Sequence, residues 1–214
     1  MIRAVILDWG GVIQRTEDPA PRGDLDKALG LPAGGTERAV FQSQVFERAM
    51  LGLVSAEACW NTIAAAVGWP LGQVDEFVER FFAGDRLDQA LLRLIRWLRS
   101  QGLLVGLLSN APPPRNSLSS AGRWGLEGLF DAQLFSYQVG VLKPDPRTYR
   151  HILATLRAPA QEALFVDDAP PNVAGALAVG MDAVRFVSTE RLLVDLAARG
   201  LPVPAPAPEE LYDP

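Results

Sequence analysis

Residues 3–13 read Arg-Ala-Val-Ile-Leu-Asp-Trp-Gly-Gly-Val-Ile, and this stretch decides the fold class. Its apolar run ends at Asp8, and the Trp-Gly-Gly that follows favours a loop. A short apolar run without alternation is typical of a strand that is covered on both faces. Residues 3–7 therefore predict a buried strand with a carboxylate at its carboxyl end.

The same pattern recurs later in the chain. Residues 103–108 are followed by Ser109-Asn110, and residues 163–166 are followed by Asp167-Asp168. A further apolar segment covers residues 183–187. Helical periodicity appears between these segments over residues 88–101, 146–156 and 171–179. The alternation of strands and helices predicts an α/β fold with a parallel sheet.

The stretch between the first strand and Asp88 has amphipathic helical character and shows no strand pattern. We expect helices there over residues 36–50, 55–67 and 71–82, with Thr36 and Ser55 as N-caps.

These patterns divide the chain into an α/β core and an insertion. The core comprises residues 1–14 and 86–200, and a small all-helical cap comprises residues 15–85. Residues 201–214 are rich in alternating proline and predict an extended surface tail.

Length and composition exclude several classes of protein. The 214 residues, with 49% hydrophobic and 21% charged residues, fit one large globular domain or a core with an insertion. A net charge of −5 without a basic run argues against a nucleic-acid partner. The single cysteine, Cys59, excludes an internal disulfide. Without a leader pattern or a bilayer-length apolar run, we expect a cytoplasmic protein with no membrane partner, whose oligomeric state is not predicted.

Polar residues that follow different parallel strands converge at one edge of the sheet. Here they are Asp8, Ser109, Asn110, Asp167 and Asp168. Three carboxylates in one crevice raise one another's pKa unless a cation compensates their charge. A hard cation with oxygen ligands, most simply Mg²⁺, meets that need.

Lys143 stands out in the segment Val-Leu-Lys-Pro-Asp-Pro, residues 141–146. Only Lys27 and Lys143 of the 20 basic residues are lysines. An ammonium is a compact charge that fits between carboxylates and phosphate oxygens, where a guanidinium would not. If the ligand carries a phosphoryl group, Lys143 is well placed to supply the positive charge that it needs; otherwise it is an exposed lysine before a turn.

Four motifs in this order resemble the haloacid dehalogenase-like hydrolase superfamily, over most of residues 2–187. They are Asp-Trp-Gly-Gly-Val-Ile at 8–13, Leu-Leu-Ser-Asn at 107–110, the segment 141–146, and Phe-Val-Asp-Asp-Ala-Pro-Pro-Asn-Val-Ala-Gly-Ala at 165–176. The resemblance implies a Rossmann-like core with a helical cap inserted after the first motif.

The resemblance also implies catalytic roles. Asp8 is the expected nucleophile, which forms an aspartyl-phosphate. Ser109 is expected to donate a hydrogen bond to a phosphoryl oxygen, and Lys143 to offset the charge of nucleophile and phosphate. Asn110 is expected either to donate to the substrate or to brace its loop.

For the metal, the resemblance implies ligation of Mg²⁺ by the Asp8 carboxylate, the main-chain carbonyl of Gly10 and Asp168, with help from Asp167. Asn172 is expected to order the acidic loop.

One departure concerns Gly10, because phosphatases of this superfamily usually carry there a second aspartate that protonates the leaving oxygen. Losing a positioned general acid typically costs about 10²–10⁴ in rate. Glu17, Asp18 or a cap residue are candidates to replace it. The aromatic residues of the cap are expected mainly to pack in its core, and they include Phe41, Phe46, Trp60 and Trp69. His151 is expected to be a structural or surface residue.

Three functions follow. The first is a Mg²⁺-dependent phosphatase acting on a small phosphorylated metabolite, such as a sugar phosphate. The second is a non-hydrolytic or very slow phosphate-binding, regulatory protein, because Gly10 replaces the acid/base. The third is a 2-haloacid dehalogenase, against which the pair Asp167-Asp168 argues, since that reaction has no cation to hold.

Overall fold

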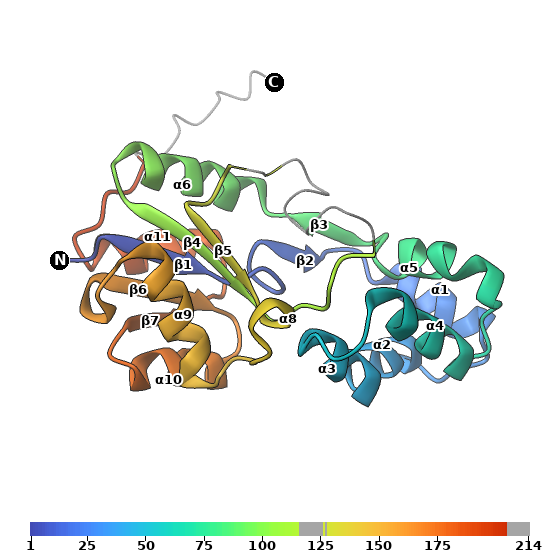
Figure 1. The fold of residues 1–214 in the computed structure, drawn as a ribbon. Coiled ribbons are helices and arrows are strands. Elements are labelled where there is room, and N and C mark those ends of the chain that lie inside the picture. Colours follow the sequence, from blue (N-terminus) through green and yellow to red (C-terminus); the bar gives the residue numbers. More distant parts are fainter. Residues whose placement is uncertain (116–125, 127, 205–214) are drawn as a thin grey trace, which may run out of the picture.

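A five-stranded parallel sheet forms the centre of the computed structural model, which describes residues 1–115, 126 and 128–204 (Figure 1). The strand order is β5–β4–β1–β6–β7. The strands are β1 (Ala4–Leu7), β4 (Leu104–Ser109), β5 (Ala132–Phe135), β6 (Ala163–Asp167) and β7 (Asp182–Arg185). The predicted α/β fold with a parallel, Rossmann-like sheet is confirmed. The hydrophobic pattern did not predict β5, whose residues Ala-Gln-Leu-Phe form too short an apolar run.

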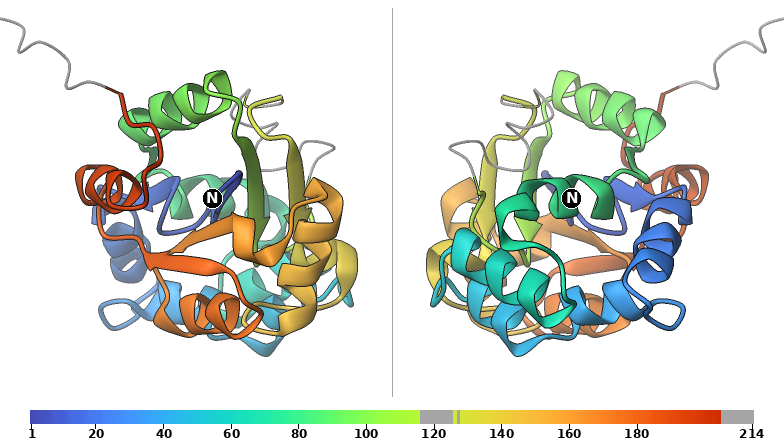
Figure 2. Two further views of the ribbon diagram at one scale, coloured as in Figure 1. Left: turned by 90° about the vertical axis from the view of Figure 1, so that its left-hand side faces the viewer. Right: turned by 90° about the vertical axis from the view of Figure 1, so that its right-hand side faces the viewer.

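Helices cover both faces of the sheet (Figure 2). They are α6 (Gln89–Ser100) and α11 (Thr189–Ala197) on one face, and α9 (Pro146–Leu156) and α10 (Pro170–Ala178) on the other. Successive residues of β1 point to opposite faces, so that Val5 packs with the first pair of helices and Ile6 with the second. Burial on both faces explains why the central strands read as continuous apolar runs.

A second hydrophobic core lies among the helices inserted after β1. These helices, which we call the helical unit, are α1 (Ala20–Ala28), α2 (Gly35–Phe41), α3 (Gln44–Met50), α4 (Ala56–Ala66) and α5 (Val74–Phe81), with a 3₁₀ turn at Leu71–Gln73. Cys59, Trp60 and Phe77 are buried among them. The helical unit lies beyond the carboxyl ends of the central strands (Figure 1).

The expectation of no strand in this region is wrong. The short strands β2 (Gln14–Thr16) and β3 (Asp85–Leu87) pair antiparallel where the chain enters and leaves the helical unit. Each has three mostly polar residues and therefore carries no hydrophobic signal. Side-chain bonds reinforce the ribbon, because Asp85 accepts from Gln14 Nε2 at 2.8 Å and from Thr16 Oγ1 at 2.8 Å.

The expected helix over residues 36–50 is divided into α2 and α3. Ser43 caps α3 by accepting from the amide of Phe46, which starts a new helix there. Ser55 is confirmed as the N-cap residue of α4. Thr36 is not an N-cap, because it lies inside α2 and donates its hydroxyl to Asp26.

The predicted extended tail, residues 201–214, lies mostly outside the described residues, and its residues 201–204 form neither helix nor strand. None of the helices in the described ranges combines the length and the apolar character that crossing a membrane requires.

Asp85 is expected to be a major contributor to stability. It is 6% exposed and accepts at 3.0 Å from Arg22, whose side chain is 12% exposed. Asp85→Ala leaves this guanidinium without its buried partner and should lower the free energy of unfolding by about 3 kcal/mol, measured by urea denaturation. Asp24→Ala, which removes an exposed partner of Lys27, should change it by less than about 0.5 kcal/mol. Equal effects of the two variants would contradict this prediction.

Candidate functional site

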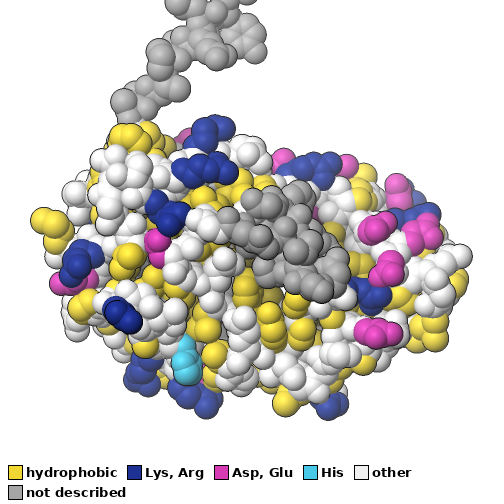
Figure 3. Space-filling view, turned by 45° about the horizontal axis from the view of Figure 1, so that its top comes forward, with side chains coloured by type: hydrophobic (Ala, Val, Ile, Leu, Met, Phe, Trp, Pro, Cys, Tyr) yellow, Lys and Arg dark blue, Asp and Glu magenta, His cyan; other side chains and the backbone are white. Residues whose placement is uncertain are grey.

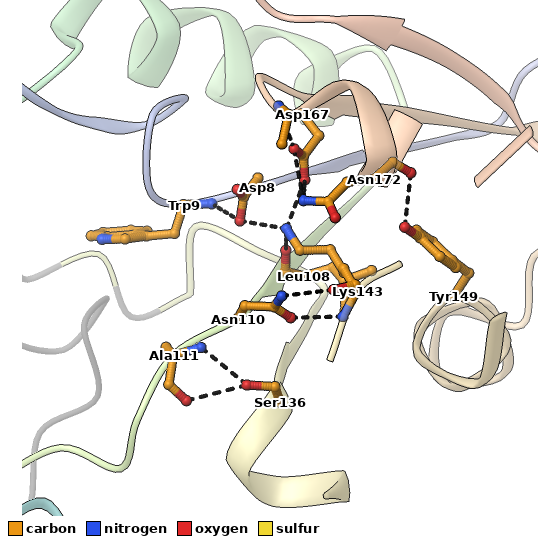
Figure 4. A network of polar contacts seen from close by, with 11 residues as sticks. Asp8, Trp9, Leu108, Asn110, Ala111, Ser136, Lys143, Tyr149, Asp167 and Asn172 are labelled. Carbon is orange, nitrogen blue, oxygen red and sulfur yellow. Dashed lines mark hydrogen bonds and ion pairs between the residues drawn. The ribbon is translucent and has the colours of Figure 1, made fainter. Parts of the chain in front are cut away.

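The predicted polar residues follow the carboxyl ends of the central strands, and Figure 4 shows Asp8, Asp167 and Asn110 around Lys143. Asp8 directly follows β1, Ser109 ends β4, and Asp167 ends β6 with Asp168 next to it. Lys143 comes from the loop that precedes α9. One carboxylate oxygen each of Asp8, Asp167 and Asp168 lie within 4.8 Å of one another. The structure thus brings together residues that are up to 160 positions apart, since 168 − 8 is 160.

Lys143 lies at the centre of this cluster, and its side chain is 1% exposed. Its Nζ is 2.7 Å from Asp8 Oδ1 and 2.7 Å from Asp167 Oδ2, and it donates to the carbonyl oxygen of Leu108 at 3.0 Å. These three partners match the three donors of an ammonium group. Lys143 therefore joins the ends of β1, β4 and β6.

The cluster carries more negative than positive charge, with three carboxylates around one ammonium. Burial raises the pKa of Asp8 to about 6, and the charge of Asp167 adds to this rise while Lys143 opposes it. Burial and the charge of Asp167 also raise the pKa of Asp168. A bound divalent cation would remove this excess of negative charge. The set of carboxylate and carbonyl oxygens fits a hard cation such as Mg²⁺.

The two adjacent aspartates have different surroundings. Asp167 is fully buried, and its carboxylate accepts from Lys143, from the Asn172 amide and from the main-chain amide of Ala169. Asp168 is the more accessible of the two. The Asp167 carboxylate is thus held in place by protein donors, while that of Asp168 is better placed to meet a ligand.

Gly11 is required where the first loop approaches Asp168. A Cβ at Gly11 would lie 2.4 Å from Asp168 Oδ2, and its φ of +80° is one that side-chain-bearing residues rarely adopt. By contrast, a Cβ at Gly10 would meet no atom within 4 Å.

Two asparagines hold the site together. Asn110 donates to the Lys143 carbonyl at 3.0 Å and accepts from the Lys143 amide at 2.8 Å, so that both ends of its side chain brace the loop. Asn172 donates to both oxygens of Asp167, at 3.0 and 3.1 Å, as expected of a residue that orders the acidic loop. Tyr149 in turn donates to the Asn172 carbonyl at 2.8 Å.

Some contacts of the site had no signal in the sequence. Ser136, at the start of α8 (Ser136–Val139), accepts from the amide of Ala111 at 3.1 Å and donates to the Met50 carbonyl at 2.7 Å. It thereby links the loop after Ser109 to the helical unit. Trp9 donates its amide to Asp8 at 2.7 Å and its ring N–H to Gln14 at 2.6 Å.

The candidates for a replacement acid lie at the entrance to the helical unit. The amides of Glu17 and Asp18 donate to the Gly84 carbonyl, and the Asp18 carboxylate accepts from the amide of Ala20. Both residues are exposed, and neither belongs to the acidic cluster found among the described residues.

The expectation that the cap aromatics pack with one another is confirmed for Phe46 and Trp60, which are buried, and Trp69 packs partly buried against them. Phe41 is 44% exposed, although its ring contacts Phe46 and Phe81 edge to face. His151 lies on the surface, as expected (Figure 3).

Comparisons with known proteins find a family model and relatives that are similar in sequence. A family model described as a haloacid dehalogenase-like hydrolase matches residues 2–180. Sesquiterpene phosphatase astK of Aspergillus oryzae is 30% identical over 179 residues, which cover 84% of this chain and 87% of that protein. Two longer curated relatives are matched over only 34% and 35% of their own length.

Solved structures share the fold. A HAD family enzyme of Bacteroides thetaiotaomicron, in complex with magnesium and inorganic phosphate, superimposes with a TM-score of 0.70 at 19% identity, covering 90% of this chain and 99% of that one. L-2-haloacid dehalogenase of Xanthobacter autotrophicus superimposes with a TM-score of 0.65 at 21% identity, covering 95% and 85%.

Alanine substitutions at Gly10 and Gly11 should have different effects on the affinity for Mg²⁺, which calorimetry measures. Gly11→Ala pushes the Asp168 carboxylate aside and should weaken binding by about 10–100-fold. Gly10→Ala adds the same atom in open space and should weaken binding much less. Equal Mg²⁺ affinity of the two variants would contradict this prediction.

Asn110→Ala should lower the free energy of unfolding of the substrate-free protein by about 2 kcal/mol, because it removes two hydrogen bonds to the main chain of Lys143. Urea denaturation checks this. An unchanged stability together with a loss of substrate affinity would instead assign Asn110 to substrate binding.

Proposed function

Because the chain belongs to the haloacid dehalogenase-like hydrolases, we propose that it is a Mg²⁺-dependent phosphatase of a small phosphorylated metabolite, such as a sugar phosphate. The observation that carries this proposal is the Lys143 ammonium between Asp8 and Asp167, with Asp168 beside them. A carboxylate nucleophile can approach a phosphate dianion only where positive charge screens their repulsion. The phosphatase astK, among the relatives, adds support.

In the proposed reaction, an Asp8 oxygen attacks phosphorus, the bond to the leaving oxygen breaks, and a water molecule then hydrolyses the aspartyl-phosphate. Lys143 neutralises charge on the nucleophile and the phosphoryl oxygens, and Ser109 donates to one of those oxygens. Asp8, the Gly10 carbonyl and Asp168, with help from Asp167, would hold Mg²⁺, which supplies further charge neutralisation at the phosphoryl group.

We assign the helical unit, within residues 15–85, as a cap over a core of residues 1–14 and 86–200. It stands beyond the strand ends, where the Met50 carbonyl accepts from Ser136 of α8 and Asp75 forms an ion pair at 2.6 Å with Arg115 in the loop after Ser109. A cap in this place excludes water from the site and contacts the leaving group.

Two other functions have specific support. The fold shared with a haloacid dehalogenase, together with Gly10, favours attack by Asp8 on carbon. The acidic pair Asp167-Asp168 counts against it, because that reaction has no cation to hold. Gly10 also favours a phosphate-binding, regulatory protein that hydrolyses its ligand very slowly or not at all, because glycine replaces the acid/base residue there.

A screen of phosphorylated compounds at neutral pH, with and without Mg²⁺, tests the proposal. Asp8→Asn removes the nucleophile with little change in shape and should lower the Mg²⁺-dependent rate by at least about 10⁴-fold. Asp24→Asn, on the surface of α1, is the control and should keep the activity. Hydrolysis that is unaffected by Asp8→Asn, or chloride release from 2-chloropropionate without Mg²⁺, would refute the phosphatase assignment.

A further inference from the structure

Among the residues that the structure describes, the surroundings of Asp8 hold a nucleophile and a buried ammonium, and Gly10 in the same loop has no side chain that could donate a proton. We propose that the substrate is an acyl phosphate or a phosphoanhydride, whose leaving oxygen departs as a weakly basic anion without being protonated. This inference rests on the proposed phosphatase function and narrows its substrate class away from alkyl phosphate esters.

Three polar side chains near Asp8 direct their protons at acceptors of the protein itself. Lys143 directs its three donors at Asp8, Asp167 and the Leu108 carbonyl. The Asn110 amide braces the Lys143 loop, and the Tyr149 hydroxyl donates to the Asn172 carbonyl. None of these groups presents a free acidic proton to a leaving oxygen.

The carboxylates of the neighbouring segments are held as hydrogen-bond acceptors. Asp18 accepts from the amide of Ala20. Asp85 accepts from Arg22 and two other side chains, and Asp88 accepts from Arg15, Thr189 and the amide of Leu91. The carboxylate oxygens of Asp18, Asp85 and Asp88 are thus already engaged by donors of the protein itself. Although burial opposes this, hydrogen bonds from Leu91 and Thr189 and the charge of Arg15 lower the pKa of Asp88.

Gly10 leaves room where a donor would fit. A Cβ built there would meet no atom within 4 Å, and its φ lies outside the positive range that favours glycine. The first loop therefore has space for a side chain two residues after Asp8, and the sequence places none there.

Neither the transfer of the phosphoryl group to Asp8 nor the hydrolysis of the aspartyl-phosphate requires a proton from an acid of the protein. An Asp8 oxygen forms a bond to phosphorus, and the electron pair of the broken P–O bond leaves on a carboxylate or a phosphate. Water then attacks phosphorus, the Asp8 carboxylate leaves, and the proton of water passes to solvent. Both leaving groups are weak bases. An alkoxide is a strong base and would need the protonation that typically contributes about 10²–10⁴ in rate.

The test measures kcat/KM with Mg²⁺ for acetyl phosphate, pyrophosphate, a series of aryl phosphates of graded phenol acidity, and glycerol phosphate. For the wild type, kcat/KM should be at least about 10³-fold higher for acetyl phosphate or for pyrophosphate than for glycerol phosphate. A higher value for acetyl phosphate identifies the acyl phosphate class, and a higher value for pyrophosphate identifies the phosphoanhydride class. Gly10→Asp should narrow this gap by at least about tenfold, by raising the rate on glycerol phosphate. Gly10→Asn, of the same size but without a titratable proton, should not narrow it.

A wild-type rate on glycerol phosphate close to that on acetyl phosphate overturns the inference and means that Asp168, Glu17 or a cap residue donates the proton. If Gly10→Asp is inactive on every compound, the wild-type values of kcat/KM for the aryl phosphates test the inference instead. A steep dependence of kcat/KM on the acidity of the phenol supports it, and no dependence overturns it. Failure of the phosphatase function looks different, since no compound is then hydrolysed in a manner that depends on Asp8 and Mg²⁺.

Discussion

The burial of one ammonium group organises this molecule. Lys143 is held between Asp8, Asp167 and the Leu108 carbonyl, at the ends of three neighbouring strands. Removing one partner of a buried ion pair typically costs about 3–5 kcal/mol, because the other charge is left uncompensated. The strand ends must therefore keep their register for the charges to balance. Two asparagines help to hold these groups in place: Asn110 bonds to the main chain of Lys143, and Asn172 bonds to the carboxylate of Asp167.

Hydrophobic periodicity predicted the elements that are long or buried on both faces. The parallel sheet, the helix over 146–156 and the convergence of Asp8, Ser109 and Asp167 all follow from it. It did not predict β2, β3 or β5, because three or four residues with polar members give no periodic signal. These strands are stabilised by partners that are distant in sequence, such as Gln14 with Asp85.

Motif order predicted which polar residues gather at the strand ends, but it did not predict their contacts. The bond from Ser136 to Met50 joins residues 86 positions apart, and neither has a neighbourhood that marks it. Asn110 had two equally reasonable interpretations, and only the position of the Lys143 main chain distinguishes them. Such contacts depend on how loops pack after the sheet has formed, which local sequence does not encode.

The short ribbon of β2 and β3 also makes the helical unit exchangeable. Thr16 and Asp85 face each other across the two strands, so the chain leaves the core and returns to it at adjacent points. The distance between these points does not depend on what lies between them. A different helical unit grafted between Thr16 and Asp85 would keep these attachment points, and it would have to replace the contacts of Arg22 with Asp85 and of Met50 with Ser136. This architecture allows the helical unit to change during evolution while the strand ends of the core are kept.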